Sequence, residues 1–226
     1  MRLSIVVPVL NEEQVLGATL AAIRDGGPHA EIIVVDGGSS DASFQIASEY
    51  ADQVLAAPRG RARQQNLGAA RSSGEALAFV HSDTIVPPTF SNEIDGALLD
   101  PWVCGGRFDI RLNDPRPMSR LIGRAISLRS RLTRSATGDQ AIFVRRAAFF
   151  RLGGFPEIPI CEDVAFMRLL KRTGRIACLR STVTSSARRW QQGGFSRTIL
   201  LMWVIKSLFL CGVAPERLAR WYADVR

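Results

Sequence analysis

The chain has 226 residues, of which 46% are hydrophobic and 22% charged, a composition that excludes a disordered chain and predicts one globular domain. Its net charge is +8, but residues 1–100 carry 6 basic and 13 acidic side chains, whereas residues 101–226 carry 23 basic and 8 acidic ones. The four cysteines form no C-x-x-C pair, which argues against a zinc site and a disulfide framework and indicates free thiols in a reducing, cytoplasmic compartment.

The first hundred residues alternate strand and helix patterns. The first apolar run turns polar at Asn11, so it is too short for a signal peptide and predicts a buried strand. Asn11 is then expected to cap the first helix. Apolar runs predict strands at 3–7, 32–35, 54–57 and 76–80, and the segments between them predict helices at 12–25, 41–50 and 59–71. This rhythm predicts an α/β fold, in which a parallel sheet has helices on both faces.

The pattern changes after residue 88. Phe108, Ile110 and Leu112 alternate with polar residues, which predicts a half-exposed strand at 105–112. The following segments predict a helix at 118–132, a strand at 140–144, a helix at 162–172 and a strongly apolar helix at 196–211. No segment has 18 uninterrupted apolar residues, so the sequence predicts no membrane span.

Polar segments follow three of the predicted strands, at residues 8–12, 36–41 and 81–83. In an open parallel sheet, ligands bind beyond the carboxyl ends of the strands, so these segments are expected at one edge. Acidic groups there suit the hydroxyls of a ribose and the N–H groups of a base. The glycine-rich phosphate-binding motifs are absent, but Asp83 beside His81 could hold a divalent cation against a pyrophosphate.

Seven segments together carry a family resemblance. They read S-I-V-V-P-V-L-N-E-E, I-I-V-V-D-G-G-S-S-D, G-R-A-R-Q-Q-N-L-G-A-A, F-V-H-S-D-T, G-D-Q-A-I-F-V-R-R, G-G-F-P and C-E-D-V-A-F. In this order, over roughly residues 3–190, the chain resembles family 2 glycosyltransferases of the glycosyltransferase-A fold. It is most similar to the short bacterial branch that lacks an obvious transmembrane tail.

The resemblance implies a mostly parallel central sheet and an inverting transfer of one sugar from a nucleotide diphosphate sugar, with UDP as the favoured nucleotide. It implies one domain over residues 1–226, with a nucleotide-sugar half at 1–100, an acceptor half at 101–195 and a helical extension at 196–226. By position it assigns the donor nucleotide to Pro8, Asn11, Glu12, Asp36, Ser39, Arg63, Asn66 and Asp83. Glu12 would lie near the ribose, Asp36 would accept from the base, and Arg63 would reach the base or the diphosphate.

The implied cofactor is a divalent metal. Asp83 matches the last carboxylate of the family's D-x-D motif, but His81 stands at the first position. An imidazole binds Mn²⁺ and suits Mg²⁺ poorly, so with His81 and Asp83 as ligands Mn²⁺ is favoured over Mg²⁺.

Glu162 and Asp163 match an acidic pair that opens a helix beside the acceptor, and the resemblance makes Asp163 the general base. A base must reach the acceptor hydroxyl on the face opposite the leaving diphosphate, and a carboxylate at a helix N-terminus stays ionised and well oriented. From spacing alone, the alternative is that the two carboxylates only cap that helix and complement its dipole.

The resemblance assigns two further segments to the acceptor and the diphosphate, namely Gly138-Asp139-Gln140 and Arg188-Arg189-Trp190. Without such a role, the first segment would be a plain turn before a strand, and the second would be the end of a strand at the surface. The glutamine of a Q-x-x-R-W motif is missing, which favours transfer of a single sugar over processive polymerisation.

The basic helix at 118–132 and the apolar helix at 196–213 suggest contact with an anionic membrane surface, at the inner face of the membrane. A buried helix and a homodimer interface are the alternatives. Nucleic acid is not an expected partner, because the basic residues are not interleaved with aromatic ones in any known motif. A sugar nucleotidyltransferase would need a glycine-rich basic loop after the first strand, which is absent. A non-catalytic or metal-independent nucleotide-sugar-binding relative stays open because of His81.

Overall fold

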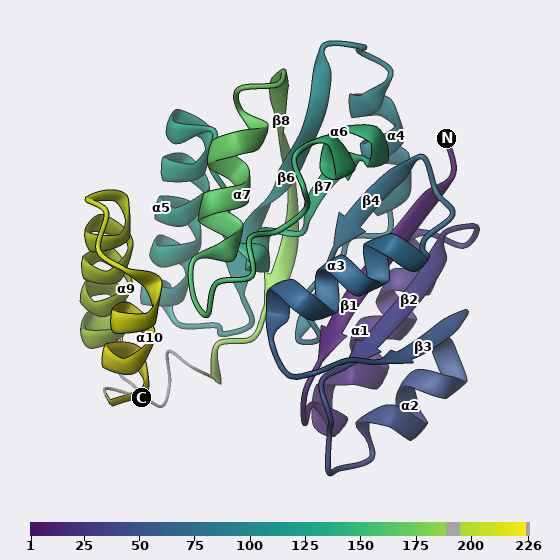
Figure 1. Ribbon diagram of the computed structural model, residues 1–226, viewed down its shortest axis with the longest axis horizontal. Coiled ribbons are helices and arrows are strands. Elements are labelled where there is room, and N and C mark those ends of the chain that lie inside the picture. Colours follow the sequence, from purple (N-terminus) through teal and green to yellow (C-terminus); the bar gives the residue numbers. More distant parts are fainter. Residues whose placement is uncertain (189–194, 225–226) are drawn as a thin grey trace.

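The computed structural model describes residues 1–188 and 195–224, and its strands form one sheet in the order β3-β2-β1-β4-β7-β6-β8-β5 (Figure 1). The strands are β1 Leu3–Val9, β2 Glu31–Asp36, β3 Gln53–Ala56, β4 Ala76–Phe79, β5 Thr84–Ile85, β6 Val103–Leu112, β7 Ile142–Arg145 and β8 Arg175–Ser185. The helices are α1 Glu13–Gly26, α2 Ser43–Tyr50, α3 Arg61–Arg71, α4 Phe90–Leu98, α5 Pro117–Thr133, α6 Arg146–Arg151, α7 Glu162–Leu170, α9 Phe195–Leu210 and α10 Pro215–Asp224, with a 3₁₀ turn η1 Gly138–Gln140.

The first half of the sheet is parallel, as the sequence predicts. Strands β3, β2, β1 and β4 pair in parallel, with Val9 opposite Asp36 and Val6 opposite Phe79. Their carboxyl ends therefore meet at one edge. Alternate residues of β1 point to opposite faces: Ile5 packs with α1 and α4, whereas Val6 packs with α3. The predicted α/β sheet with helices on both faces is confirmed.

The second half of the sheet is mixed rather than parallel. Strand β7 runs antiparallel to both β4 and β6, whereas β6 and β8 pair in parallel. Strands β5 and β8 and helices α4 and α6 were not anticipated from the sequence, whereas α10 lies within the helical extension predicted at 196–226. Strand β8 has one short apolar run at 176–179, with an arginine on each side and mostly polar residues after it, so its strand signal in the sequence is only weak.

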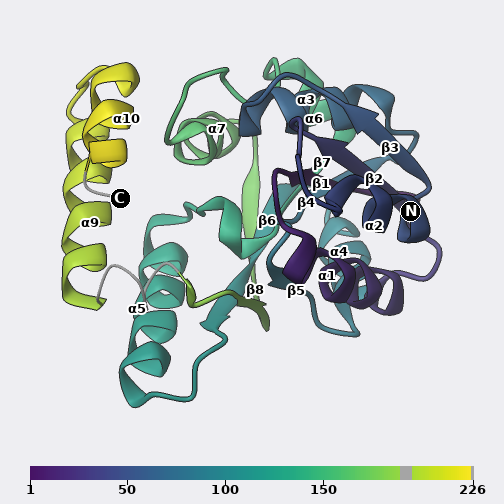
Figure 2. The same cartoon turned by 90° about the horizontal axis from the view of Figure 1, so that it is seen from below.

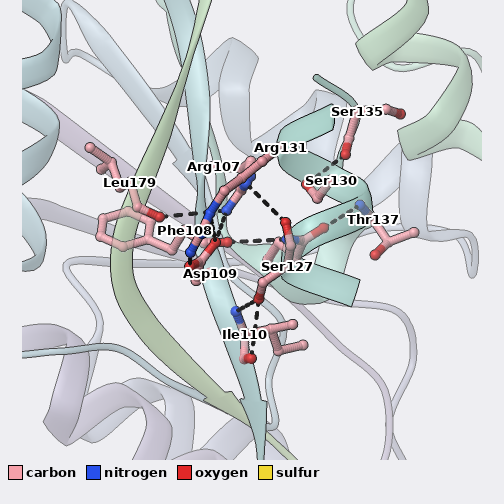
Figure 3. Close-up of polar contacts among 11 residues, drawn as sticks. Arg107, Phe108, Asp109, Ile110, Ser127, Ser130, Arg131, Ser135, Thr137 and Leu179 are labelled. Carbon is pink, nitrogen blue, oxygen red and sulfur yellow. Dashed lines mark hydrogen bonds and ion pairs between the residues drawn. The ribbon is translucent and has the colours of Figure 1, made fainter. Parts of the chain in front are cut away.

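The prediction that 105–112 is a half-exposed strand is wrong. Strand β6 is buried at every position except Arg111, and Arg107 is fully buried. Figure 3 shows that Arg107 and Arg131 both pair with Asp109, under helix α5. The Ile110 N–H donates to the Ser127 hydroxyl at 3.0 Å. A strand whose polar residues form a buried ion network thus shows the same alternating sequence as a strand whose polar face is exposed to water.

Helices α9 and α10 lie at the end of the molecule opposite α1 and α2 (Figure 2). Helix α9 packs on α5 through Ile199 and Met202, which contact the cluster around Ile122 and Ile126. Within residues 1–188 and 195–224, no helix has the length and apolar character that crossing a bilayer requires.

Candidate active site

The loops after β1 and β2 are joined by hydrogen bonds at the carboxyl edge of the sheet. The Asn11 N–H donates to the Ser39 hydroxyl at 2.9 Å, and the Asn11 side-chain oxygen accepts from the Ser40 N–H at 2.8 Å. Asn11 has a left-handed backbone, with φ of 54°, and does not cap α1 as predicted; Glu12 stands at that position. These predicted donor residues are therefore held as one polar surface.

Asp36 is buried, and its carboxylate shapes its own loop. One oxygen accepts from the N–H groups of Gly38 and Ser39 at 3.0 and 2.9 Å, and the other accepts from the Ser39 hydroxyl at 2.5 Å. Pro8 is buried inside β1 opposite Val35, so it supports this edge from within the sheet.

Gln64, which the sequence analysis did not single out, joins the carboxyl ends of β1 and β2. Its amide nitrogen donates to the carbonyl groups of Val9 and Val35, both at 2.8 Å, and the side chain is buried. A buried amide that satisfies two strand-end carbonyls fixes their spacing. Its place in a polar helix segment gave no signal of this role.

Three predicted site residues from distant segments come together beside this edge. The Arg188 guanidinium contacts the Glu12 carboxylate at 2.5 Å. The hydrogen bond to Glu12 raises the pKa of Arg188, and the charge of Asp83 adds to that effect. The Ser186 N–H donates to the Asp83 carbonyl at 3.2 Å, which brings the end of β8 to this loop. Arg189 and Trp190 lie outside the described residues.

The proposed metal ligands differ in how well they fit a cation. His81 is lodged against Gly138: a Cβ added to that glycine would lie 2.4 Å from the His81 Nε2 atom, and this nitrogen is buried. The His81 Nε2 atom thus lies against the Gly138 backbone, and the metal role of His81 stays a prediction. The described residues contain no group of three metal-ligating side chains. Asp83 fits a divalent metal that takes one carboxylate and completes its shell with substrate phosphates and water.

Asp163 opens α7 and connects to the same loop through Gly138. Its two carboxylate oxygens accept from the N–H groups of Gly138 and Val164, both at 2.6 Å. Burial and then the neighbouring charge of Glu162 raise the pKa of Asp163 to about 6, against the opposing effects of the Gly138 N–H and Arg61. The residue is only partly buried, so a ligand can reach it.

Glu162 has a different environment from Asp163. It is buried, and its carboxylate pairs with the Arg61 guanidinium of α3 at 3.1 Å. The pairing engages one carboxylate oxygen, Oε1, and holds the start of α7 against α3. The catalytic role of Glu162 stays a prediction. Arg61, its partner, was not anticipated, since 101 positions separate the two in the chain.

Gln140 does not face an acceptor, contrary to the prediction. It is fully buried, its amide donates to the Phe108 carbonyl at 3.2 Å, and it accepts from the Thr137 N–H at 3.4 Å. It thus fixes the turn η1 that presents Gly138 to Asp163. Asp139, in the same turn, is only partly buried.

Arg63 and Asn66 contact the loop before α7 instead of the nucleotide edge. Asn66 donates to the Phe155 carbonyl at 2.8 Å and accepts from the Phe155 N–H at 2.9 Å. Arg63 pairs with Glu157 at 3.0 Å, and both side chains are 55% exposed. Asn66 therefore supports this loop, Arg63 is paired with Glu157, and the roles of both at the nucleotide stay predictions.

Comparisons with known proteins agree with this arrangement. Residues 4–158 match the model of glycosyl transferase family 2. Glucosyl-3-phosphoglycerate synthase of Mycolicibacterium smegmatis is 34% identical over 108 residues, which are 42% of this chain and 36% of that protein. The match thus covers well under half of that curated relative.

Two solved structures share the fold. The mannosyltransferase PcManGT from Pyrobaculum calidifontis, in complex with GDP-Man and Mn²⁺, aligns with a TM-score of 0.69 at 18% identity, over 99% of this chain and 69% of that one. Glucosyl-3-phosphoglycerate synthase from Mycobacterium tuberculosis, in complex with Mn²⁺ and UDP-Glc, aligns with a TM-score of 0.64 at 22% identity, over 94% and 79%. Since the family model covers more than half of the sequence and the sheet has this glycosyltransferase-A architecture, the chain belongs to glycosyl transferase family 2.

Proposed function

We propose that the protein is an inverting glycosyltransferase that moves one sugar from a UDP-sugar to an acceptor hydroxyl, with Asp163 as the general base. The observation that carries this proposal is the contact chain from the loop after β4 to Asp163. His81 packs on Gly138, and the Gly138 N–H donates to the Asp163 carboxylate. The partly exposed Asp163 carboxylate is therefore connected to the loop that carries Asp83 through a single residue, Gly138.

The chemistry of Asp163 suits proton removal near neutral pH. A general base works best when its pKa lies near the operating pH, because it must be both ionised and basic. With a pKa of about 6, Asp163 is mostly ionised at pH 7 and is a stronger base than an ordinary aspartate. In an inverting transfer, it would accept the hydroxyl proton as the acceptor oxygen attacks the anomeric carbon and the diphosphate leaves on the opposite face.

The donor site of the proposal is the carboxyl edge of β1, β2 and β4. Glu12 would bind the ribose, and a uracil N–H would take the place of the Ser39 hydroxyl at Asp36. Arg188, held between Glu12 and Asp83, would bind the diphosphate as it leaves. Complexes of the related folds with UDP-Glc and GDP-Man support a nucleotide sugar as the donor class.

Asp83 would hold a divalent metal, which neutralises the charge of the diphosphate when it is bound. The preference for Mn²⁺ over Mg²⁺ rests on the two related structures that hold Mn²⁺, since His81 turns its Nε2 atom to Gly138.

Thermal-shift measurements with a panel of nucleotide diphosphate sugars, with and without Mn²⁺, test the donor site. A ligand at a hundredfold excess over its Kd stabilises the fold by about 2.7 kcal/mol, which raises the Tm of a chain this size by roughly 5–10 °C. We expect a UDP-sugar to give this shift with Mn²⁺ and a smaller one in Asp83→Asn. If no nucleotide sugar shifts the Tm, the proposed donor site is wrong. Equal binding with and without metal would identify the protein as a metal-independent relative. Binding without turnover would identify it as a non-catalytic relative.

We further propose that the protein contacts an anionic membrane surface through α5 and α9, at the cytoplasmic face. Two stripes of exposed apolar side chains follow helical spacing: Met118, Leu121, Leu128 and Leu132 on α5, and Leu200, Trp203 and Leu210 on α9. Exposed arginines, Arg120 and Arg124, accompany the first stripe. Apolar side chains with flanking cations match an anionic headgroup layer, where each cation contributes about 1 kcal/mol.

Flotation with anionic vesicles at low salt tests this surface. We expect the wild type to float, and Leu121→Asp and Trp203→Asp to float less. Leu99→Asp, at a leucine after α4 that is even more exposed than Leu121, should change nothing. Absence of flotation by the wild type would overturn the membrane proposal. A dimer that the two variants dissociate would assign the surface to a second copy of this chain.

A further inference from the structure

Arg129 of α5 and Lys206 of α9 are two cations on helices that take no part in the donor edge. Their place follows from the packing of the two helices. Ile126 and Met202 belong to the same apolar cluster. Arg129 is three residues beyond Ile126 and Lys206 four beyond Met202, so each cation follows one turn later on the same helix face.

Helix α9 continues from this point to α7. Phe209 lies with Ala165 and Leu169 of α7 around a surface hollow of about 290 Å³. Lys206 is therefore between the contact with α5 and the contact with α7, where α7 begins with Glu162 and Asp163. Figure 1 shows α5, α7 and α9 gathered at this end of the molecule.

The polar atoms of this cluster are close but not paired. The Nε and Nη2 atoms of Arg129 and one carboxylate oxygen of Asp139 are buried and have no hydrogen-bond partner among the described residues. Burial and the charge of Arg129 lower the pKa of Lys206 to about 8. The two cations are thus near enough to repel each other, and both interact with the charge of Asp163.

Charge balance with Asp139 and Asp163 is an alternative reason for the two cations. Contact geometry argues against it, because neither Arg129 nor Lys206 forms an ion pair within 4 Å anywhere in residues 1–188 or 195–224. Asp163 accepts from backbone N–H groups instead. Two buried guanidinium nitrogens without hydrogen-bond partners are unfavourable unless a ligand supplies the missing acceptors.

We propose that Arg129 and Lys206 bind the phosphate group of a phosphorylated acceptor and thereby place its hydroxyl at Asp163. This inference rests on the proposed role of Asp163 and names the acceptor class of the same site. A guanidinium binds two phosphate oxygens at once, and an ammonium adds a point charge, so together they match a dianionic group better than a single carboxylate. The donor diphosphate is assigned separately to Arg188 and Asp83.

Binding of glycerol phosphate to the full chain, saturated with UDP and Mn²⁺ so that the donor site is filled, tests the inference. We expect glycerol phosphate to bind at least about tenfold more tightly than glycerol, and Arg129→Gln and Lys206→Gln each to weaken it about tenfold or more. Lys206→Arg keeps the charge and should restore binding. Arg151→Gln, at an exposed arginine on α6, is the control and should bind as the wild type does.

The UDP affinity is measured in the same samples. Failure of UDP to bind contradicts the proposed function, whereas normal UDP binding with no glycerol phosphate binding, or with equal binding in all variants, overturns only this inference.

A competition experiment distinguishes a free phosphorylated acceptor from a phosphate carried by a lipid. Vesicles of phosphatidic acid in phosphatidylcholine are added as the competitor, with pure phosphatidylcholine vesicles as the control. Competition by the phosphatidic acid vesicles, lost in Arg129→Gln, would identify a lipid-borne phosphate as a ligand of the pair. Competition that survives in Arg129→Gln would overturn the assignment of the lipid phosphate to Arg129.

Discussion

The two halves of the sheet carry charge in different ways. In the parallel half, which is acidic overall, the carboxylates stand in loops at the strand ends and are satisfied by backbone N–H groups, as at Asp36. In the mixed half, which is basic overall, charged side chains are buried between elements. Arg107 and Arg131 share Asp109 there, and Glu162 reaches across to Arg61.

This difference follows from how each half is built. Parallel strands bring short loops to one edge, so carboxylates can stay near solvent and still converge on a ligand. In the mixed half, α5 and α7 cover strands that carry charge, and each charge must find a partner in the interior. Asp163 lies at the boundary, where burial and the neighbouring charge of Glu162 raise its pKa, which suits the proposed role as a base.

The largest expected effect breaks the buried network of the basic half. Asp109→Ala leaves Arg107 buried without its carboxylate, so we expect a loss of about 3–5 kcal/mol in the free energy of unfolding. Urea unfolding measures it. Glu157→Ala removes an exposed partner of Arg63 and should change the stability by about 1 kcal/mol or less. If the two variants lost similar amounts of unfolding free energy, buried and exposed ion pairs would not differ in the way that we describe.

Asp163→Asn should stabilise the fold at neutral pH. Because the folded-state pKa of Asp163 is raised from 3.8 to about 6, the fold favours the protonated form, and stability is lost as the pH rises through this range. Asparagine cannot ionise, so the variant should gain up to about 3 kcal/mol at pH 7.5 and almost nothing at pH 4. Urea unfolding at both pH values checks this. A gain that does not depend on pH would argue against an ionised, poorly compensated Asp163.

Glu162→Gln should move the pH dependence of turnover. The Glu162 charge raises the pKa of Asp163, so its removal should lower that pKa and shift the half-maximal rate to a lower pH, by up to about one unit. UDP release measured between pH 4.5 and 8 gives the profile. Glu157→Gln, a distant carboxylate, should leave the profile in place. An upward shift in Glu162→Gln would contradict the assignment of the base.

The smallest effect is expected at Arg63. Its guanidinium is engaged with Glu157 and exposed, so Arg63→Gln should change the donor Kd by less than about twofold. Titration with the donor found by thermal shift measures it. A tenfold loss would show that Arg63 leaves Glu157 and binds the nucleotide, which would extend the donor site to α3.

Much of the parallel half could be predicted from the sequence, because its strands are short apolar runs and its ligand loops follow them directly. The β6 strand could not be predicted as buried, since alternation alone does not distinguish Arg107 and Asp109 in a buried network from residues facing water. The partner of a buried charge lies far away in the chain, as Arg61 lies from Glu162, so no local pattern shows it.

Motifs in loops could be placed from the sequence: Glu12 and Asp83 meet at Arg188, and Asp163 connects to the same loop through Gly138, while their roles stay predictions. Gln140 could not be placed, because its position in a motif does not show that its side chain turns into the interior. Arg129 and Lys206 carried no motif, and only the packing of α5 on α9 brings them together.

The most direct test of Asp163 as the base compares two quantities in Asp163→Asn and the wild type, namely the rate of UDP release from the donor sugar and the Kd of that donor. Transfer to water gives a measurable rate before the acceptor is known. Loss of a positioned general base should lower the rate by about 10²–10⁴ while the Kd stays within about twofold. An unchanged rate, or a rate that falls only in proportion to donor binding, would contradict Asp163 as the base.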